Sequence, residues 1–469
     1  MEFHSARFGL FLAVVLLLYW SLANRRGARY AVLLVASYVF YAGWELWFLS
    51  LIVFSTFLDY FCGRAIHASE DPRTRRRWLY ASLGGNLAVL GYFKYSAWGA
   101  DGLASLFAAV GLDPSGLSWV WRAAVPVGIS FYTFQTLSYT IDIYRGKLRP
   151  ARSFGEFALF VAFFPQLVAG PIVRAVQFLP QLDLRPRFDR ARLHDGLYRI
   201  GTGLLKKVLL ADVLGRYLVD PFYSAPESYA WWVHVLALYG FAFQIYGDFA
   251  GYSDVAIGAA RLLGFDLPEN FDGPYRSRSV REFWRRWHIS LSSWVRDYIY
   301  FPLGGSRGSE LKVARNLFVT MLIIAVWHGS SLLWVIYGLL QGGALVLERA
   351  LERRRGGEPF TTTPVRSLVA WFAAFHFAVF TEFFIRAESL GQFGAVFGTS
   401  GEETAVHTFG LLALAGAFAT HLLPGRTSEG FRARVCALPT AAVALLFGVA
   451  CGLVAIAVVG ETPFIYFQF

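Results

Sequence analysis

Residues 316–347 read NLFVTMLIIAVWHGSSLLWVIYGLLQGGALVL, and this stretch holds no Asp, Glu, Lys or Arg. About 20 apolar residues in a helix are enough to cross the hydrocarbon core of a membrane, so an uncharged run of this length predicts membrane-embedded helix. The run contains one histidine, His328, between Trp327 and Gly329. Because an ionisable group is costly to bury in such surroundings, His328 is the first candidate functional residue.

The same apolar character extends over the whole chain of 469 residues, which is 56% apolar and 16% charged. An ordinary soluble domain carries about 25% charged residues, so a set of soluble domains is excluded, and so is disorder. Apolar segments recur at 8–22, 30–43, 46–61, 78–98, 123–141, 195–217, 231–250, 314–348, 367–386, 406–424 and 436–459. They predict an all-α polytopic membrane protein of about 11–13 helices, organised as a single transmembrane domain over residues 1–469.

Charge in the loops predicts the orientation of these segments. The formal net charge is +11, and basic residues cluster after alternate apolar segments, at 25–29, 64–77 and 145–152. Because such loops stay in the cytoplasm, the N-terminus is predicted to lie outside the inner (plasma) membrane. Anionic lipids attract basic loops of this kind. No nucleic-acid-reading motif accompanies them, so the expected partners are membrane lipids rather than nucleic acid.

Residues 154–173 interrupt the alternation, because basic residues flank this apolar segment on both sides. Its centre contains Pro165 and Pro171, and proline removes a helical hydrogen bond. A re-entrant hairpin that enters from the cytoplasm explains both facts, since broken backbone at that depth is tolerated where protein surrounds it. A kinked spanning helix is the alternative.

Residues 276–308 combine aromatic and basic side chains at helical spacing. Ser279, three residues before Glu282, is a capping-box pattern that predicts a helix start, and Pro302 predicts its end. One face of this helix carries Phe283, Trp287, Leu291, Trp294 and Tyr298. Another face carries Arg281, Arg285, His288, Ser292 and Arg296. An amphipathic helix of this kind is suited to lying in a membrane interface.

Two interpretations of this basic face stay open. In the first, the helix is an anchor, with tryptophan in the interface and arginine on anionic lipid. In the second, Arg281, Arg285 and Arg286 bind the phosphates of an acyl carrier or coenzyme, and His288 lies beside the reacting group. His328 can likewise act as a neutral base, or it can be a structural histidine satisfied by a neighbouring helix.

No metal site is expected, because neither histidine has a ligand-type partner three or four residues further on. A last polar feature is Asp248 with Asp254, at the end of an apolar segment that also contains Gly247 and Gly251. The glycines predict close helix packing. We expect the two carboxylates to orient an arginine or histidine, or to line a substrate cavity.

Specific motifs run in order along nearly the whole chain. They are PVGISFYTFQ (126–135), FPQLVAGPI (164–172), DFAGYSDVAIG (248–258), PENF (268–271), EFWRRWHISLS (282–292), WHG (327–329) and PFIYFQF (463–469). With these motifs the sequence resembles the membrane-bound O-acyltransferase (MBOAT) family, in the bacterial branch that includes the alginate O-acetylation membrane protein. Arg278 and Val280 depart from the expected pattern, which affects substrate detail rather than reaction type.

The resemblance implies a funnel-shaped helical fold whose catalytic-motif region is 276–348. It implies that His328 is the catalytic histidine and His288 the second motif position, with Trp327 beside them. It further implies a cytoplasmic acyl thioester donor, acetyl-coenzyme A, and no bound cofactor. The acceptor would be an exported SGNH-type partner that passes the acetyl group to a polysaccharide such as alginate.

Three alternatives to alginate O-acetylation stay open at this point. The same branch acylates peptidoglycan and other cell-wall polymers. A transporter or flippase for an acyl carrier would use a similar cavity, although the chain shows no repeated halves of the kind many transporters have. A scaffold for a secretion complex would be indifferent to loss of either histidine.

Overall fold

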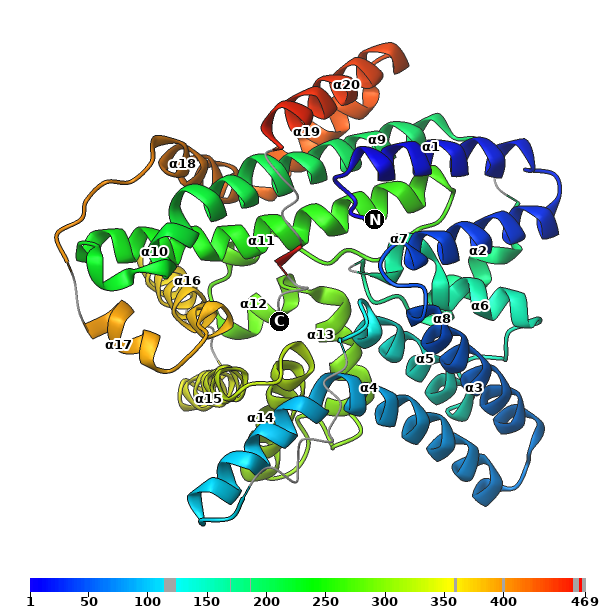
Figure 1. Cartoon of the computed structure of the whole chain (residues 1–469), viewed down its shortest axis with the longest axis horizontal. Helices are drawn as coiled ribbons and strands as arrows, with labels where there is room; N and C mark the ends of the chain where they lie inside the picture. The colour runs from blue at the N-terminus through cyan, green and yellow to red at the C-terminus, as the bar shows by residue number, and fades with distance from the viewer. Residues whose placement is uncertain are drawn as a thin grey trace. The chain divides into compact units, whose positions relative to one another are not determined.

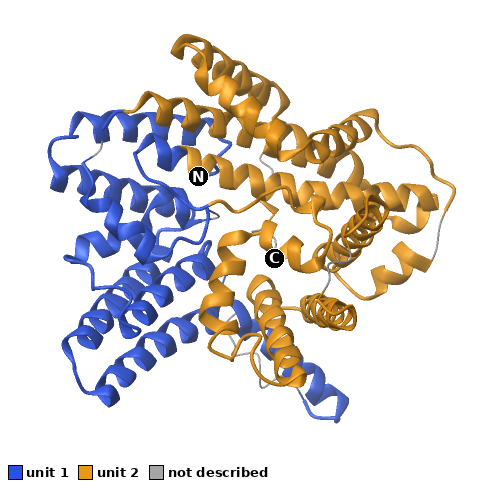
Figure 2. Ribbon diagram, turned by 180° about the vertical axis from the view of Figure 1, so that it is seen from behind, with its two compact units in different colours: residues 1–188, 259–268 blue, residues 189–258, 269–469 orange. Residues whose placement is uncertain are grey.

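The computed structural model describes residues 1–113, 124–168, 170–185, 187–357, 361–398, 401–458 and 464–465. Helices make up most of these residues, and no β-strand occurs among them (Figure 1). The chain forms two compact units, shown in different colours in Figure 2. Unit 1 contains residues 1–188 and 259–268, and unit 2 contains residues 189–258 and 269–469.

The helices of unit 1 begin with four long ones and continue with shorter pieces. They are α1 (Ala6–Ser21), α2 (Arg26–Ala42), α3 (Phe48–Ala68), α4 (Pro72–Ala109), α5 (Ile129–Tyr144), α6 (Phe154–Ala162), α7 (Phe164–Leu167), α8 (Ala175–Phe178) and η2 (Leu179–Asp183). Local sequence sets the helix starts: the Asp71 carboxylate caps α4, and Pro72 occupies its first turn. In the interior, Asp59 of α3 accepts hydrogen bonds from Ser82 and Asn86 of α4.

The proline-containing segment 154–173 is not one helix. Helix α6 ends at Ala162 after nine residues, and α7 follows the break at Phe163. At about 1.5 Å per residue, a helix of this length is too short to cross a membrane. Every residue from Phe157 to Leu167 is buried inside unit 1. The break matches the expectation from the prolines, and entry from the cytoplasm stays a prediction.

Unit 2 holds the remaining elements. They are α9 (Arg190–Leu205), η3 (Lys206–Asp212), η4 (Gly215–Val219), α10 (Asp220–Ser224), η5 (Pro226–Ser228), α11 (Trp231–Leu262), η6 (Pro274–Arg276), α12 (Val280–Arg286), α13 (Ile289–Val295), η7 (Arg296–Tyr300), α14 (Glu310–His328), α15 (Leu332–Arg354), α16 (Pro364–Arg386), α17 (Gly391–Gly398), α18 (Thr408–Leu422), α19 (Gly425–Ala437) and α20 (Thr440–Ala457). The last residues of α11 belong to unit 1.

Helix α11 packs closely against α9, as the glycine spacing predicts. A Cβ atom at Gly251 would lie 2.6 Å from the carbonyl oxygen of Gly203, which leaves no room for a side chain. Gly247 lies in the same way against Leu210 of η3. This close approach of two backbones brings the charged residues of α9 and α11 within ion-pair distance of one another.

Among the described residues, several helices are long and apolar enough to cross a membrane. Five pass this test by themselves: α3, α14, α15, α16 and α20. Helices α18 and α19 pass it together but are bent by 95° at the break between them. The chain is therefore a multi-pass membrane protein, as its composition predicts.

The uncharged run 314–348 is two helices rather than the single segment expected from hydropathy. Helix α14 ends at His328, and α15 begins at Leu332 after a short turn. The two helices lie against each other, because Gly338 of α15 leaves room for Met321 and Ala325 of α14. Hydropathy could not reveal the turn, since Gly329, Ser330 and Ser331 carry no charge. His328 therefore lies at a helix end and not within a helix.

The prediction of one continuous amphipathic helix from Ser279 to Pro302 is also wrong. Ser279 does cap α12, with its hydroxyl accepting from the backbone N–H of Glu282, but α12 ends at Arg286. The helical chain resumes at Ile289, so His288 lies in the break. The apolar face does not lie in a membrane interface either, because Trp287 and the other residues of this face are buried inside unit 2.

Candidate active site

His288 has an unusual backbone and a buried side chain. Its φ of 42° and ψ of 55° place it in the left-handed region, where no other non-glycine residue of the described chain is found. Such a conformation costs about 1–3 kcal/mol and persists only where the surroundings impose it. The side chain has 0% exposure, and the Phe249 ring lies 4.7 Å from the imidazole. Burial lowers the pKa of His288 to about 3, so the imidazole is neutral near pH 7.

His328 is held at the turn between α14 and α15. The indole of Trp334 stacks on the imidazole, with ring centroids 5.3 Å apart and planes at 13°. A Cβ atom at Gly329 would overlap the Trp334 ring, so the glycine permits this stacking. The indole of Trp327 lies nearly perpendicular to the His328 ring at 4.8 Å. The aromatic rings fix the plane in which the imidazole lies.

The structure brings the two candidate histidines together from separate elements. The ring centroids of His288 and His328 are 5.9 Å apart, and Trp327 lies 6.0 Å from His288. His328 is 8% exposed, so both rings are shielded from bulk water. Two imidazoles this close act on the same small group only if it lies at the edge of both rings.

A cavity of about 510 Å³ lies in the same unit, and neither His288 nor His328 is among the residues that line it. Its lining includes Ile324, which is one helical turn before His328, and Ile289, which directly follows His288. Apolar residues of α14 form one side of the cavity, and four arginines line it as well: Arg281, Arg285, Arg296 and Arg349. A cavity with an apolar part and a cluster of guanidinium groups suits a ligand with a short acyl chain and phosphates.

The arginines of this cavity differ in what holds them. Three form ion pairs with carboxylates: Arg281 with Glu352 at 2.9 Å, Arg349 with Glu310 at 3.0 Å, and Arg296 with Asp297 at 2.7 Å. Arg285 forms no ion pair with any described carboxylate, and its side chain is exposed. Arg285 is thus the cavity cation available to a ligand anion.

Arg286 is the one predicted phosphate-binding arginine that does not line the cavity. Its guanidinium pairs with Glu282 at 2.8 Å and lies 3.6 Å from Asp272. The structure therefore places Arg286 in ion pairs with Glu282 and Asp272, and its contact with a donor phosphate stays a prediction.

Asp248 lines a second cavity, of about 370 Å³. Its carboxylate pairs with Lys207 at 2.6 Å and accepts a hydrogen bond from the backbone N–H of Ile465 at 2.7 Å. The lining of this second cavity also includes Arg216 and Arg386. Asp248 therefore lines a polar cavity that is distinct from the arginine-lined one.

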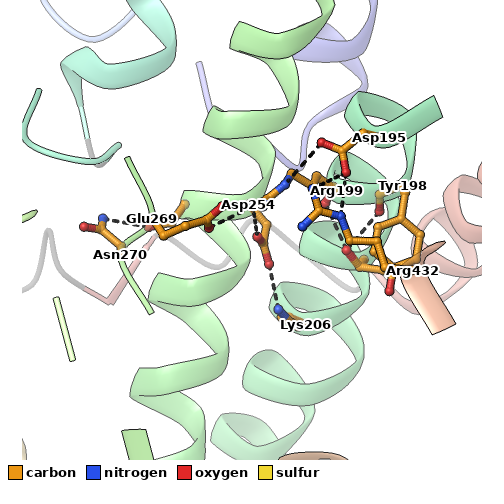
Figure 3. Close-up of polar contacts among 10 residues, drawn as sticks. Asp195, Tyr198, Arg199, Lys206, Asp254, Glu269, Asn270 and Arg432 are labelled. Carbon is orange, nitrogen blue, oxygen red and sulfur yellow. Dashed lines mark hydrogen bonds and ion pairs between the residues drawn. The ribbon is translucent and has the colours of Figure 1, made fainter. Parts of the chain in front are cut away.

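Asp254 lies in neither cavity lining but in a network of charged side chains (Figure 3). Its two carboxylate oxygens face Arg199 at 3.2 Å and Lys206 at 2.6 Å. Arg199 also bonds to the Glu269 carboxylate, with one contact at 3.0 Å. The expectation that Asp254 orients an arginine agrees with this arrangement. The arrangement gives no support to direct contact between Asp254 and a substrate.

Comparisons with known proteins now decide the family. The family model for MBOAT, the membrane-bound O-acyltransferase family, matches residues 128–385. The chain belongs to this family. It is therefore an O-acyltransferase of the membrane, as its motifs predict.

Relatives within the family carry names of polymer-modifying enzymes. The chain is 41% identical over 394 residues to the probable alginate O-acetylase AlgI of Pseudomonas putida, covering 83% of this chain and 78% of that protein. It is 42% identical over 384 residues to the probable alginate O-acetylase AlgI of Pseudomonas aeruginosa, covering 81% and 71%. It is 34% identical over 394 residues to the peptidoglycan O-acetyltransferase of Helicobacter pylori, covering 76% and 71%.

The sequence analysis missed some residues of this candidate site. Trp334 gave no signal, because it is one more apolar residue in an apolar helix. Arg349 appears in the sequence as a loop charge, and only the pairing of α14 with α15 brings it to the cavity. Asn270 belongs to the motif PENF, which carried the family resemblance without suggesting a role for the residue.

Proposed function

We propose that this acyltransferase moves an acetyl group from acetyl-coenzyme A in the cytoplasm to an acceptor hydroxyl on the other side of the inner membrane, for O-acetylation of an exported polysaccharide such as alginate. The observation that carries the proposal is the 5.9 Å separation of the His288 and His328 rings, in the same unit as an arginine-lined cavity. The names of the alginate O-acetylase relatives support the acceptor.

In the proposed reaction His328 is the general base. Its imidazole takes the proton from the acceptor hydroxyl while the hydroxyl oxygen attacks the thioester carbonyl carbon. The tetrahedral intermediate then expels the coenzyme A thiolate, which receives the proton from the imidazolium. Help from a general base of this kind is worth about 10²–10⁴ in rate.

His288 has a different role in the proposal. Because burial lowers the pKa of His288 to about 3, the ring is a neutral imidazole with one N–H donor. This donor would stabilise the oxyanion of the tetrahedral intermediate, or hold the thioester carbonyl in place. A neutral donor does not compete with His328 for the proton of the acceptor.

The two cavities support access for two substrates. The arginine-lined cavity suits the phosphates of coenzyme A, and on this proposal it is reached from the cytoplasm. The polar cavity at Asp248 contains both acidic and basic side chains, which suits a hydroxyl-rich acceptor. On this proposal the N-terminus lies outside, and an exported SGNH-type protein passes the acetyl group to the polymer.

The test is transfer of radiolabelled acetate from acetyl-coenzyme A by the purified protein in lipid nanodiscs. Alginate oligosaccharide with the exported partner serves as acceptor, and peptidoglycan fragments serve as the rival acceptor. We expect His328→Ala to lose transfer by about 10²-fold or more. His194→Ala is the control, because His194 is also buried but bonds to Thr440 and the Cys436 carbonyl. Full transfer by folded His328→Ala would end the proposal, and movement of an acyl carrier without a covalent product would favour a transporter.

A further inference from the structure

The peptide 269–272 runs beside the helix break that contains His288. The backbone N–H of Asp272 donates to the carbonyl of Arg286 at 3.0 Å, and the N–H of Ile289 donates to the carbonyl of Asn270 at 2.9 Å. These two hydrogen bonds lie on either side of Trp287 and His288. A continuous helix would use both the Arg286 carbonyl and the Ile289 N–H within itself, so the neighbouring peptide replaces the helical partners and holds the break open.

The side chain of Asn270 adds two contacts to this arrangement. Its amide oxygen accepts from the hydroxyl of Ser290 at 2.6 Å, in the first turn of α13. Its amide nitrogen donates to the hydroxyl of Ser253 at 3.0 Å, on α11. Asn270 is 1% exposed, so these contacts are made away from water. The residue thus ties the chain directly after His288 to a long helix of the same unit.

The peptide is itself fixed at its first residue. The Glu269 carboxylate bonds to Arg199 of α9, and Arg199 bonds in turn to Asp254 of α11 (Figure 3). Arg199 is 5% exposed. Asn270 therefore extends from an anchored point, which makes it able to hold another segment in place.

The opposite side of the peptide packs on the same aromatic group as His288. The ring of Phe271 lies 5.2 Å from Trp287 and 5.1 Å from Phe249, and Phe249 lies 4.7 Å from His288. Asn270 thus bonds to the two residues that follow the break, and Phe271 packs on Trp287 within it, from adjacent positions of one peptide.

We propose that Asn270 is a positioning residue for His288 in acyl transfer. Through its carbonyl and its amide it fixes the left-handed backbone at position 288, and so it sets where the imidazole lies relative to His328. Asn270 itself does not contact the reacting groups. The inference rests on the function proposed above, in which His288 acts on the thioester carbonyl.

The experiment measures kcat and KM for acetyl-coenzyme A with Asn270→Ala in nanodiscs. Because misplacing a reacting group by about 1 Å can cost 10²-fold in rate, we expect kcat to fall by about 100-fold. The KM should change by less than about threefold, since the donor cavity is untouched. Asn86→Ala is the matched control: Asn86 is an equally buried amide of unit 1, hydrogen-bonded to Asp59 and Ser55, and its loss should leave kcat near the wild-type value in the folded fraction.

A double-mutant cycle separates positioning from general support of the fold. In a His288→Gly background, where glycine adopts the left-handed backbone without strain, Asn270→Ala should lower the residual kcat by less than about threefold. An equal loss in both backgrounds would overturn the positioning role. Ser290→Ala removes a single hydroxyl and provides a second variant if Asn270→Ala does not fold. We expect it to lower kcat by less than Asn270→Ala does, and to have no effect in the His288→Gly background. An unchanged kcat in the wild-type background would count against the inference. Wild-type protein that transfers no acetyl group would instead overturn the proposed function.

Discussion

Replacing Arg285 by glutamine tests how the donor is held. Arg285 is one of the residues of the arginine-lined cavity and is the cavity arginine without an ion pair to a described carboxylate. A hydrogen bond to a charged group is worth about 1.5–3 kcal/mol, and each 1.4 kcal/mol is about tenfold in an equilibrium constant. Because the side chain is exposed and salt screens it, we expect the lower end, a rise of about tenfold in the KM for acetyl-coenzyme A.

The assay is the initial rate of acetyl transfer as a function of donor concentration, at low and at high salt. Arg286→Gln is the control, because this neighbouring arginine pairs with Glu282 and lies outside the cavity lining. We expect less than about a twofold change in KM for the control. The second donor is acetyl-pantetheine, a thioester without phosphates.

The phosphate-free donor makes the prediction specific. If Arg285 binds a donor phosphate, Arg285→Gln should leave the KM for acetyl-pantetheine unchanged. The reasoning is refuted if Arg285→Gln weakens both donors equally, or if Arg286→Gln raises the KM for acetyl-coenzyme A as much as Arg285→Gln does.

Three further predictions concern stability, measured as the thermal unfolding midpoint in detergent. Gly251→Ala should destabilise by about 1–3 kcal/mol, because its Cβ would lie 2.6 Å from the Gly203 oxygen; Gly416→Ala on α18, with nothing within 4 Å, should not. Arg199→Ala should cost about 1–3 kcal/mol through the lost hydrogen bonds to charged groups, because Asp254 keeps Lys206 and Glu269 is half exposed; a midpoint equal to that of wild type would contradict the network. Burial lowers the pKa of His288 from 6.5 to about 3, so the unfolded chain binds the proton more readily than the folded chain. The unfolding midpoint of wild type should therefore fall more between pH 7 and pH 5 than that of His288→Gln. Equal falls in the two proteins would argue against the burial of His288.

Much of the fold could be predicted from hydropathy, because most apolar segments contain helix where the structure describes them, although 154–173 is broken and 314–348 is two helices. The failures have physical causes. The break at His288 is imposed by the peptide 269–272, and spacing within residues 276–308 carries no information about that contact. The turn after His328 contains glycine and serine, which signal a turn, but the absence of charge made the whole run resemble a single segment.

The candidate site was predictable in part. The motifs identify His288 and His328, and the structure places their rings together. The different roles of Arg285 and Arg286 depend on which partner each finds in three dimensions. Glu282, four residues before Arg286, is a helical pairing signal that does favour a scaffold role for Arg286, whereas nothing in the sequence shows that Arg349 reaches the same cavity as Arg285.

Three of the four cavity arginines are held by carboxylates of the protein itself. A free arginine side chain loses about 2 kcal/mol of rotamer entropy when it is immobilised. For Arg281, Arg296 and Arg349 this loss of rotamer entropy occurs when the chain folds and not when a ligand binds. The cavity is preorganised in that sense. Guanidinium groups that are already fixed bind an anion without losing this entropy a second time.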